Sequence, residues 1–106
     1  MKVRYLITII AAVSISASAF ATGNGEELFK KHGCNPCHSV DDKLVGPAFK
    51  EVAAKYRGNK NAQEILEKKV RSGGSGVWGR MPMPPASKSV SDGDIKTIVQ
   101  WILSLK

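Results

Sequence analysis

Apolar and polar positions along the chain follow helical spacing, and the clearest pattern lies near the C-terminus. Apolar residues recur there every three or four positions, at Ile95, Ile98, Val99, Ile102 and Leu105. This spacing predicts an amphipathic helix with one apolar face. Ser91 is placed to cap its N-terminus, and Asp92 and Asp94 in the first turn interact favourably with the helix dipole. No alternating run long enough for a strand is found, so the sequence predicts an all-α fold.

Two short helices are expected in the first half of the chain. The first begins with Asn24 as N-cap, has Glu27 at capping-box spacing, and ends at Gly33. The second opens at Pro47, because proline is favoured at a first helical position, and ends near Tyr56.

A third helix and a long irregular segment are expected before the C-terminal helix. The third helix follows Asn61, has Glu64 at capping-box spacing, and stops at Gly73. From Ser72 to Ser89 the chain contains four glycines, and prolines stand at 82, 84 and 85, so the segment is irregular. A loop of this length in a small domain usually has a function.

The first 21 residues have the features of a secretory signal peptide. Lys2 and Arg4 precede a short apolar run, and small residues end in Ala19-Phe20-Ala21, an A-x-A cleavage pattern. We expect cleavage after Ala21; cleavage after Ala19 and an uncleaved membrane anchor are the alternatives. The expected organisation is therefore a signal peptide over 1–21 and one domain over 22–106.

The composition limits what a chain of 106 residues can be. It is 42% hydrophobic, has a formal net charge of +7 and contains two cysteines. These values exclude a multidomain enzyme, a coiled coil and a disulfide-dense scaffold. A domain this small needs a stabilising crosslink or cofactor. No nucleic-acid partner is expected, because the basic residues are not interleaved with aromatic ones and the chain is exported.

The motif Cys34-Asn35-Pro36-Cys37-His38 predicts such a cofactor. C-x-x-C-H is the pattern of covalent c-type haem attachment. Two thiols three residues apart can add to the two vinyl groups on one edge of the porphyrin, and the histidine that follows then lies beneath the iron. The haem would also supply the apolar core that a small domain lacks.

Three other interpretations of the motif are open. A thioredoxin-like redox pair would need a preceding strand and a βαβ unit. A plain disulfide would close a very small loop and add little stability. A structural zinc site usually combines two separated ligand pairs, whereas here four ligands would lie within seven residues. They would be His32, Cys34, Cys37 and His38.

Met83 is the expected second iron ligand. It lies in Pro82-Met83-Pro84-Pro85, where prolines on both sides restrict the backbone and hold the sulfur in place. A thioether is a soft, neutral donor that favours ferrous iron, so His/Met ligation raises the reduction potential. Met81 is expected instead to fill a gap in the core. His32 is expected to be an exposed, solvated imidazole.

Several motifs follow one another in an order that is typical of one family. Besides the signal peptide and C-x-x-C-H, they are Val45-Gly46-Pro47-Ala48, Gly76-Val77-Trp78-Gly79, Pro82-Met83-Pro84-Pro85 and Trp101-Ile102-Leu103-Ser104. Over its whole mature part the chain resembles the short, single-haem class I cytochromes c of Gram-negative bacteria, named by their α-band wavelength. The resemblance implies about four short helices around one covalent haem c. It also implies an electron carrier of the periplasm that is not an enzyme.

The resemblance also implies roles for individual residues. Cys34 and Cys37 would hold the haem, and His38 and Met83 would ligate its iron. The Pro47 carbonyl would accept the proton on the other ring nitrogen of the histidine.

Further residues would act at the haem propionates or near the methionine. Trp78 would donate its indole N–H to a propionate. Lys69 lies where the family often has a basic propionate partner, with a solvated helix face as an equal alternative. Trp101 is expected to pack in the core. Ala86 departs from the family, which usually has an asparagine there that bonds the methionine sulfur.

The partners implied by the resemblance are redox proteins. The donor would be a membrane quinol-oxidising complex, and the acceptor a terminal reductase, peroxidase or oxidase. The carrier is expected to be a monomer without stable membrane insertion after signal cleavage. Basic side chains near the haem edge would steer docking, with a merely solvated basic face as the alternative. They are Lys30, Lys31, His32, Lys43 and Arg80. The alternative functions are a haem subunit of a larger redox enzyme, and a haem enzyme or sensor with an open distal site.

Overall fold

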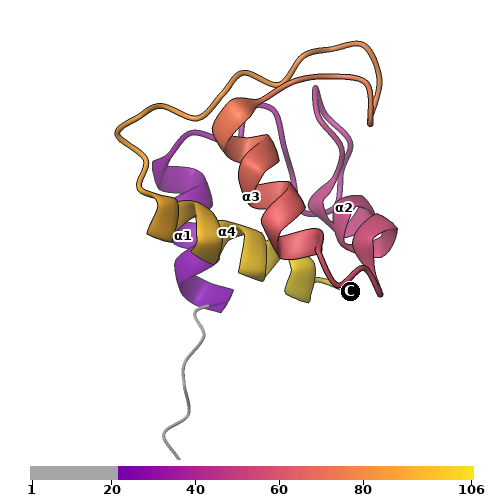
Figure 1. Cartoon of the computed structure of the whole chain (residues 1–106), viewed down its shortest axis with the longest axis horizontal. Coiled ribbons are helices and arrows are strands. Elements are labelled where there is room, and N and C mark those ends of the chain that lie inside the picture. The colour runs from indigo at the N-terminus through magenta and orange to yellow at the C-terminus, as the bar shows by residue number, and fades with distance from the viewer. Residues whose placement is uncertain (1–21) are drawn as a thin grey trace, which may run out of the picture.

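The computed structural model describes residues 22–106, which form four helices joined by loops (Figure 1). The helices are α1 (Thr22–Lys31), α2 (Phe49–Tyr56), α3 (Ala62–Ser72) and α4 (Asp92–Ser104). The expected all-α fold is confirmed, since the only β-pairing within residues 22–106 is an isolated bridge between Gly74 and Met83. No helix in this part of the chain is long and apolar enough to cross a membrane. The expected signal peptide, 1–21, lies outside the described residues.

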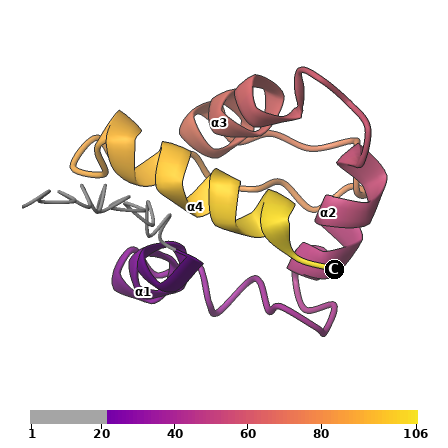
Figure 2. The same cartoon turned by 90° about the horizontal axis from the view of Figure 1, so that it is seen from below.

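Helix α4 is the element against which the other three helices pack. It contacts α1, α2 and α3, and Figure 2 shows it between α1 on one side and α3 on the other. The predicted apolar face is buried at Ile95, Ile98, Val99 and Ile102. Ser91 caps the helix as predicted, because its Oγ accepts a hydrogen bond from the Asp94 amide at 3.1 Å.

Three aromatic rings form the centre of the core. Phe29 of α1, Phe49 of α2 and Trp101 of α4 are all buried. The ring centroids of Phe29 and Phe49 lie 5.2 Å apart. The Trp101 centroid lies 5.6 Å from that of Phe29 and 5.7 Å from that of Phe49. These separations lie in the favourable range for aromatic pairs, so the cluster joins three helices at one point. The expected core position of Trp101 is confirmed.

Helices α1 and α4 approach each other at Gly25. A Cβ atom at this position would lie 2.2 Å from the Cβ of Trp101, so the contact requires glycine. Beyond the end of α1, His32 Nε2 donates to the Asp94 carboxylate at 2.8 Å. The His32 side chain is only 15% exposed, so the expectation of a solvated imidazole is wrong. The sequence does not reveal this partner because it lies 62 residues away.

The hydrogen bond from His32 also affects the ionisation of its partner. It holds the pKa of the Asp94 carboxyl below its ordinary value, and the positive charge of Lys31 and a hydrogen bond from Ser91 act in the same direction. The ionised carboxylate therefore stabilises the junction between the end of α1 and the start of α4.

Two helix starts differ in detail from the predictions. Asn24 lies inside α1, whose described part runs from Thr22, and is therefore not the cap. α3 begins after Asn61 as predicted, but the Asn61 side chain makes no hydrogen bond that caps the helix. The Asn61 amide donates instead to Asn59 Oδ1 at 2.8 Å, in a local turn. Gly73 ends α3 as predicted, with φ of 67°.

Helix α2 begins at Phe49, not at Pro47 as expected. The Phe49 amide donates to the Ser39 carbonyl at 2.9 Å, and the Lys50 amide to the Val40 carbonyl at 3.1 Å. The preceding loop thus satisfies two of the free N-terminal donors of the helix. Pro47 remains outside the helix, and its carbonyl is available to a different donor.

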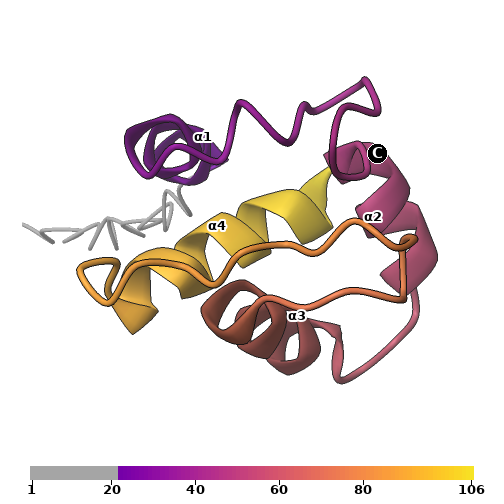
Figure 3. The same ribbon diagram turned by 90° about the horizontal axis from the view of Figure 1, so that it is seen from above.

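The segment between α3 and α4 is irregular, as predicted, and Figure 3 shows it passing over both helices. We call residues 73–91 the long loop. Gly74 and Met83 exchange two backbone hydrogen bonds of 2.9 Å and 2.8 Å, and the Ala86 amide donates to the Val70 carbonyl at 2.9 Å. The returning half of the loop is therefore attached to the C-terminal end of α3.

Gly25→Ala is expected to destabilise the fold. Alanine is favoured over glycine in a helix by about 1 kcal/mol, but overpacking against Trp101 should cost about 1–3 kcal/mol. Equilibrium unfolding of the holo-protein in guanidinium chloride measures the difference. Gly93→Ala is the matched control, because its Cβ would come no closer than 3.9 Å to Ser91 Oγ. Equal free energies of unfolding for Gly25→Ala and the control would contradict the close helix approach.

Candidate functional site

An apolar cleft opens between the loop after α1, helix α3 and the long loop. Its apolar lining includes Phe49, Val52, Leu66, Val99 and Ile102. The cleft contains about 1060 Å³ of empty space, including the open solvent at its mouth. A smaller hollow adjoins it, and both are lined by Cys37, His38 and Met83. Its mainly apolar walls are typical of a site that binds an apolar ligand.

The ring of His38 is fixed by three neighbours. Its Nδ1 donates to the Pro47 carbonyl at 2.9 Å. The ring stacks on Phe49, with centroids 4.9 Å apart and planes inclined by 21°. A Cβ atom on Gly46 would lie 2.4 Å from the His38 Cε1, so glycine is needed to leave room for the ring. With the proton on Nδ1, the Nε2 atom keeps the lone pair that a metal ligand requires.

The two cysteines lie in a tight turn directly before His38. The amides of Cys37 and His38 both donate to the Cys34 carbonyl, at 3.2 Å and 3.0 Å. Both thiols are half-buried, are not joined in a disulfide, and line the smaller hollow. Burial raises the pKa of the Cys34 thiol, and the neighbouring Cys37 adds to this effect. The sulfur atoms of Cys34 and Cys37 thus both lie beside the cleft and are not bonded to each other.

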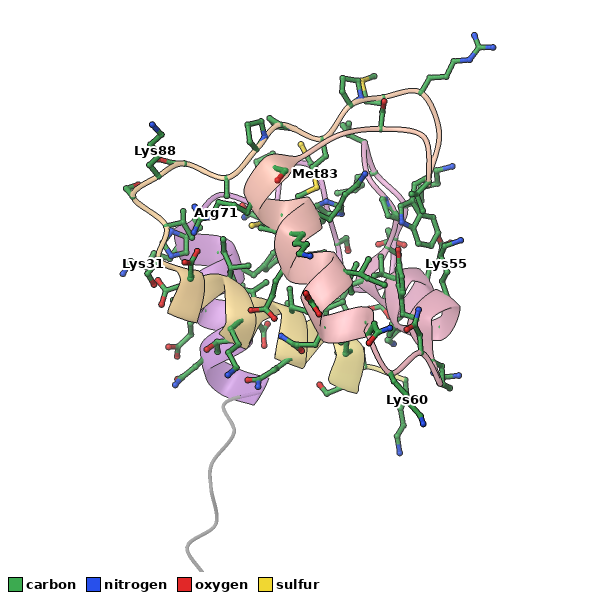
Figure 4. The ribbon with its side chains drawn as sticks, in the orientation of Figure 1. Lys31, Lys55, Lys60, Arg71, Met83 and Lys88 are labelled. Atoms are coloured by element: carbon green, nitrogen blue, oxygen red, sulfur yellow. The ribbon has the colours of Figure 1, made fainter. Side chains whose placement is uncertain are left out.

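Met83 reaches the same cleft from the long loop, where Figure 4 shows it beside the end of α3. A Cβ atom on Gly73 would lie 2.3 Å from the Met83 carbonyl oxygen. The lack of a side chain at Gly73 thus lets the segment that carries Met83 approach α3. Met81 is 67% exposed, so its expected core position is wrong. It precedes the pairing with Gly74 and stays at the mouth of the cleft.

Trp78 and Lys69 both line the cleft. Trp78 is 37% exposed, and the Lys55 Nζ lies 5.3 Å from its ring centroid, within the range of a cation–π contact. A Cβ atom on Gly74 would lie 3.2 Å from the Lys69 Nζ. Lys55 was not expected at the site, since no local sequence pattern relates α2 to the tip of the long loop.

The structure brings the candidate residues together but separates the basic ones. The seven residues beside the cleft are Cys34, Cys37, His38, Pro47, Lys69, Trp78 and Met83. Among the basic residues expected at the rim, Lys43 also lines the cleft. Lys30 instead pairs with Glu26 in its own helix, at 3.5 Å. Gly46 leaves room for the His38 ring, and Gly73 leaves room for the segment that carries Met83. The sequence does not reveal either role, because the fold brings these residues close together.

A family model described as cytochrome c matches residues 23–106. The chain belongs to the cytochrome c family.

The most similar relatives include small bacterial cytochromes. Cytochrome c-551 of Pseudomonas aeruginosa is 42% identical over 106 residues, and cytochrome c-552 of Nitrosomonas europaea is 44% identical, each match covering 100% of both chains. Cytochrome c-551 of Azotobacter vinelandii is 51% identical over 82 residues, which are 77% of this chain and 98% of the relative.

Solved structures show the same fold. The crystal structure of Nitrosomonas europaea cytochrome c552 matches with a TM-score of 0.73 and 49% identity, over 76% of this chain and 99% of that chain. The class 1 cytochrome MtoD of Sideroxydans lithotrophicus matches with a TM-score of 0.70 and 34% identity, over 80% of this chain and 96% of that chain. The expected class I cytochrome c fold is confirmed.

Membership in the family establishes the cofactor and the kind of function. The protein binds one covalent haem c with its iron, and it is an electron-transfer protein. The expected cofactor and the expected kind of function are both confirmed. The site suits this cofactor, because apolar walls, two thiols, an imidazole nitrogen and a thioether meet in the cleft and the hollow that adjoins it. The thioredoxin-like, zinc and disulfide interpretations of C-x-x-C-H are therefore set aside.

Gly46→Ala is expected to disturb the site through the His38 ring. The added methyl group would overlap the imidazole, so we expect a loss of about 1–3 kcal/mol in stability and a shifted haem absorption spectrum. Thermal unfolding of the holo-protein, followed at the Soret band, measures both effects. Gly93→Ala serves as the control that leaves the spectrum unchanged. A Gly46→Ala protein with the stability and spectrum of wild type would show that this glycine does not position the ring.

Proposed function

We propose that the protein is a one-electron carrier of the periplasm whose haem iron is ligated by His38 and Met83. The observation that carries the proposal is that these two side chains reach one apolar cleft from two separate loops. The bound haem supplies an iron atom that alternates between the ferrous and ferric states. His38 would bind through Nε2, because Nδ1 is engaged with the Pro47 carbonyl. Met83 would present a neutral sulfur that favours the ferrous state.

The remaining candidate residues would attach and orient the haem. Cys34 and Cys37 would form the two thioether bonds, since one turn of backbone holds both thiols at the cleft. Trp78 and Lys69 would bind the propionates with an indole N–H and an ammonium group. Their place on the cleft lining supports this assignment.

The location follows from the N-terminal sequence. Residues 1–21 would act as a signal peptide and direct the domain 22–106 to the periplasm. The family match that begins at residue 23 supports this division. The C-x-x-C-H motif, which is the pattern of covalent haem attachment, agrees with an exported chain.

The partners would be redox proteins that dock at the mouth of the cleft. Large exposed apolar side chains gather there, at Val45, Val77, Trp78 and Met81, and Lys43 lies among them. A membrane quinol-oxidising complex would be the donor, and a terminal reductase, peroxidase or oxidase the acceptor. A carrier has to dissociate quickly, so the interface would be small, below roughly 1,200 Å² in total. The carrier would work as a monomer.

Met83→Ala tests the ligation. Without the thioether, the ferric protein should lose its methionine–iron charge-transfer band near the red end of the spectrum, the reduction potential should fall, and ferrous protein should bind CO. Visible spectroscopy and redox titration measure these changes. Met81→Ala is the matched control and should keep both the band and the potential. If Met81→Ala loses the band and Met83→Ala keeps it, the assignment of the sulfur ligand is wrong.

Lys43→Gln tests electrostatic steering at the cleft. The rate of electron transfer with an acidic redox protein from the same source should fall as ionic strength rises, and it should fall less for Lys43→Gln. Stopped-flow measurements over a salt series give both slopes. Lys60→Gln is the control, since Figure 4 shows Lys60 at the opposite end of the molecule from Met83. A flat salt dependence in wild type would mean that apolar contact alone directs docking.

A further inference from the structure

Arg71, the penultimate residue of α3, connects three parts of the chain. Its Nη1 donates to the Ser87 carbonyl at 3.2 Å, and its Nη2 to the Val90 carbonyl at 2.7 Å. The same Nη2 lies 2.7 Å from Asp92 Oδ1, at the first residue of α4. Figure 4 shows Arg71 between α3 and the part of the long loop that descends to α4. The guanidinium therefore links α3 to the last residues of that loop and to the start of α4.

The two carbonyl contacts are more important than the ion pair. Asp92 is 94% exposed, so water and salt screen its attraction to the arginine. The Arg71 side chain is only 33% exposed. Its hydrogen bond to the Val90 carbonyl is partly buried, whereas its bond to the Ser87 carbonyl is exposed. Hydrogen bonds from a charged donor are stronger than neutral ones.

Arg71 is the side-chain member of a set of anchors that closes the loop over the cleft. The other anchors belong to the backbone: the Gly74–Met83 pair and the bond from Ala86 to Val70. Met83 belongs to the first of these backbone anchors and lies four residues before Ser87. Ala86 has no polar side-chain atom with which to hold the methionine. The closure of the segment 83–90 thus depends on few contacts, and segments of this kind open before the core does.

We infer that Arg71 is a positioning residue that keeps the segment 83–90 closed and so controls how readily the Met83 sulfur leaves the iron. The inference rests on the proposed ligation by Met83. Arg71 does not touch the ligand itself. It shifts the equilibrium between a closed loop, with the sulfur in the cleft, and an open loop that admits an external ligand.

Imidazole binding to the ferric holo-protein measures the open fraction. The external ligand binds only after the sulfur has left, so its apparent affinity is proportional to the population of the open loop. Arg71→Gln should raise this affinity about tenfold, the factor that corresponds to the loss of one charged hydrogen bond. Arg71→Lys should raise it less, because one charged donor remains. Arg57→Gln, at an exposed position after α2, is the matched control and should equal wild type.

Amide hydrogen exchange gives a second measurement that does not involve the iron. In Arg71→Gln the amides of Met83 and Ala86 should exchange faster, because their acceptors Gly74 and Val70 release them when the loop opens. The amide of Val99, in the centre of α4, should exchange as in wild type.

Two results would overturn the inference. One is that Arg71→Gln and Arg57→Gln give the same imidazole affinity and the same exchange rates. The other is that exchange at Val99 rises together with exchange at Met83, because Arg71 would then stabilise the whole fold. If wild type shows no methionine–iron band, the proposed ligation fails, and the exchange measurement still decides whether Arg71 closes the loop.

Discussion

The stacking of His38 on Phe49 joins the candidate site to the core of the protein. One side of Phe49 carries the imidazole, and the same ring makes edge contacts with Phe29 and Trp101. Trp101 in turn lies against Gly25, where α1 and α4 approach each other. The orientation of the imidazole is therefore set by the packing of three helices and not by its own loop alone. A change at the α1–α4 contact would be transmitted to the ring through two aromatic side chains.

The two proposed iron ligands are held by unequal parts of the structure. His38 rests on the buried aromatic cluster and on a hydrogen bond to Pro47. Met83 rests on an extended loop with one backbone pairing and few buried side chains. Local stability in a protein rises with buried apolar contacts, so the methionine side of the cleft is the more easily opened one. This asymmetry follows from sequence composition, because a segment rich in glycine and proline can form neither a helix nor a broad apolar face.

The sequence predicts those features that depend on neighbours along the chain. The apolar face of α4, its Ser91 cap, the glycine that ends α3 and the irregular long loop all follow from local spacing, and C-x-x-C-H predicts the cofactor. The errors concern residues whose partners are distant. His32 was expected in solvent, but α4 supplies Asp94 to it. Met81 was expected in the core, although the pairing of Gly74 with Met83 leaves it outside. The start of α2 was placed at Pro47, because the hydrogen bonds that its first amides donate to the Ser39 and Val40 carbonyls cannot be read from helix propensity.

The apolar side chains that the polypeptide leaves exposed gather at the cleft, where both the haem and a docking partner would contact them. Within residues 22–106, the large apolar side chains with high exposure are Leu44, Val45, Ile65, Val77, Trp78 and Met81. Four of these six line the cleft, and Leu44 adjoins one of them in sequence. A small domain has little apolar surface to spare, and folding alone would favour polar residues at these positions. Lys43 beside the same opening adds a charge that acts at longer range than the apolar contacts. The apolar surface that the haem does not cover, together with Lys43, would suit the proposed docking, in which charge steers the encounter and a small apolar contact completes it and is readily reversed.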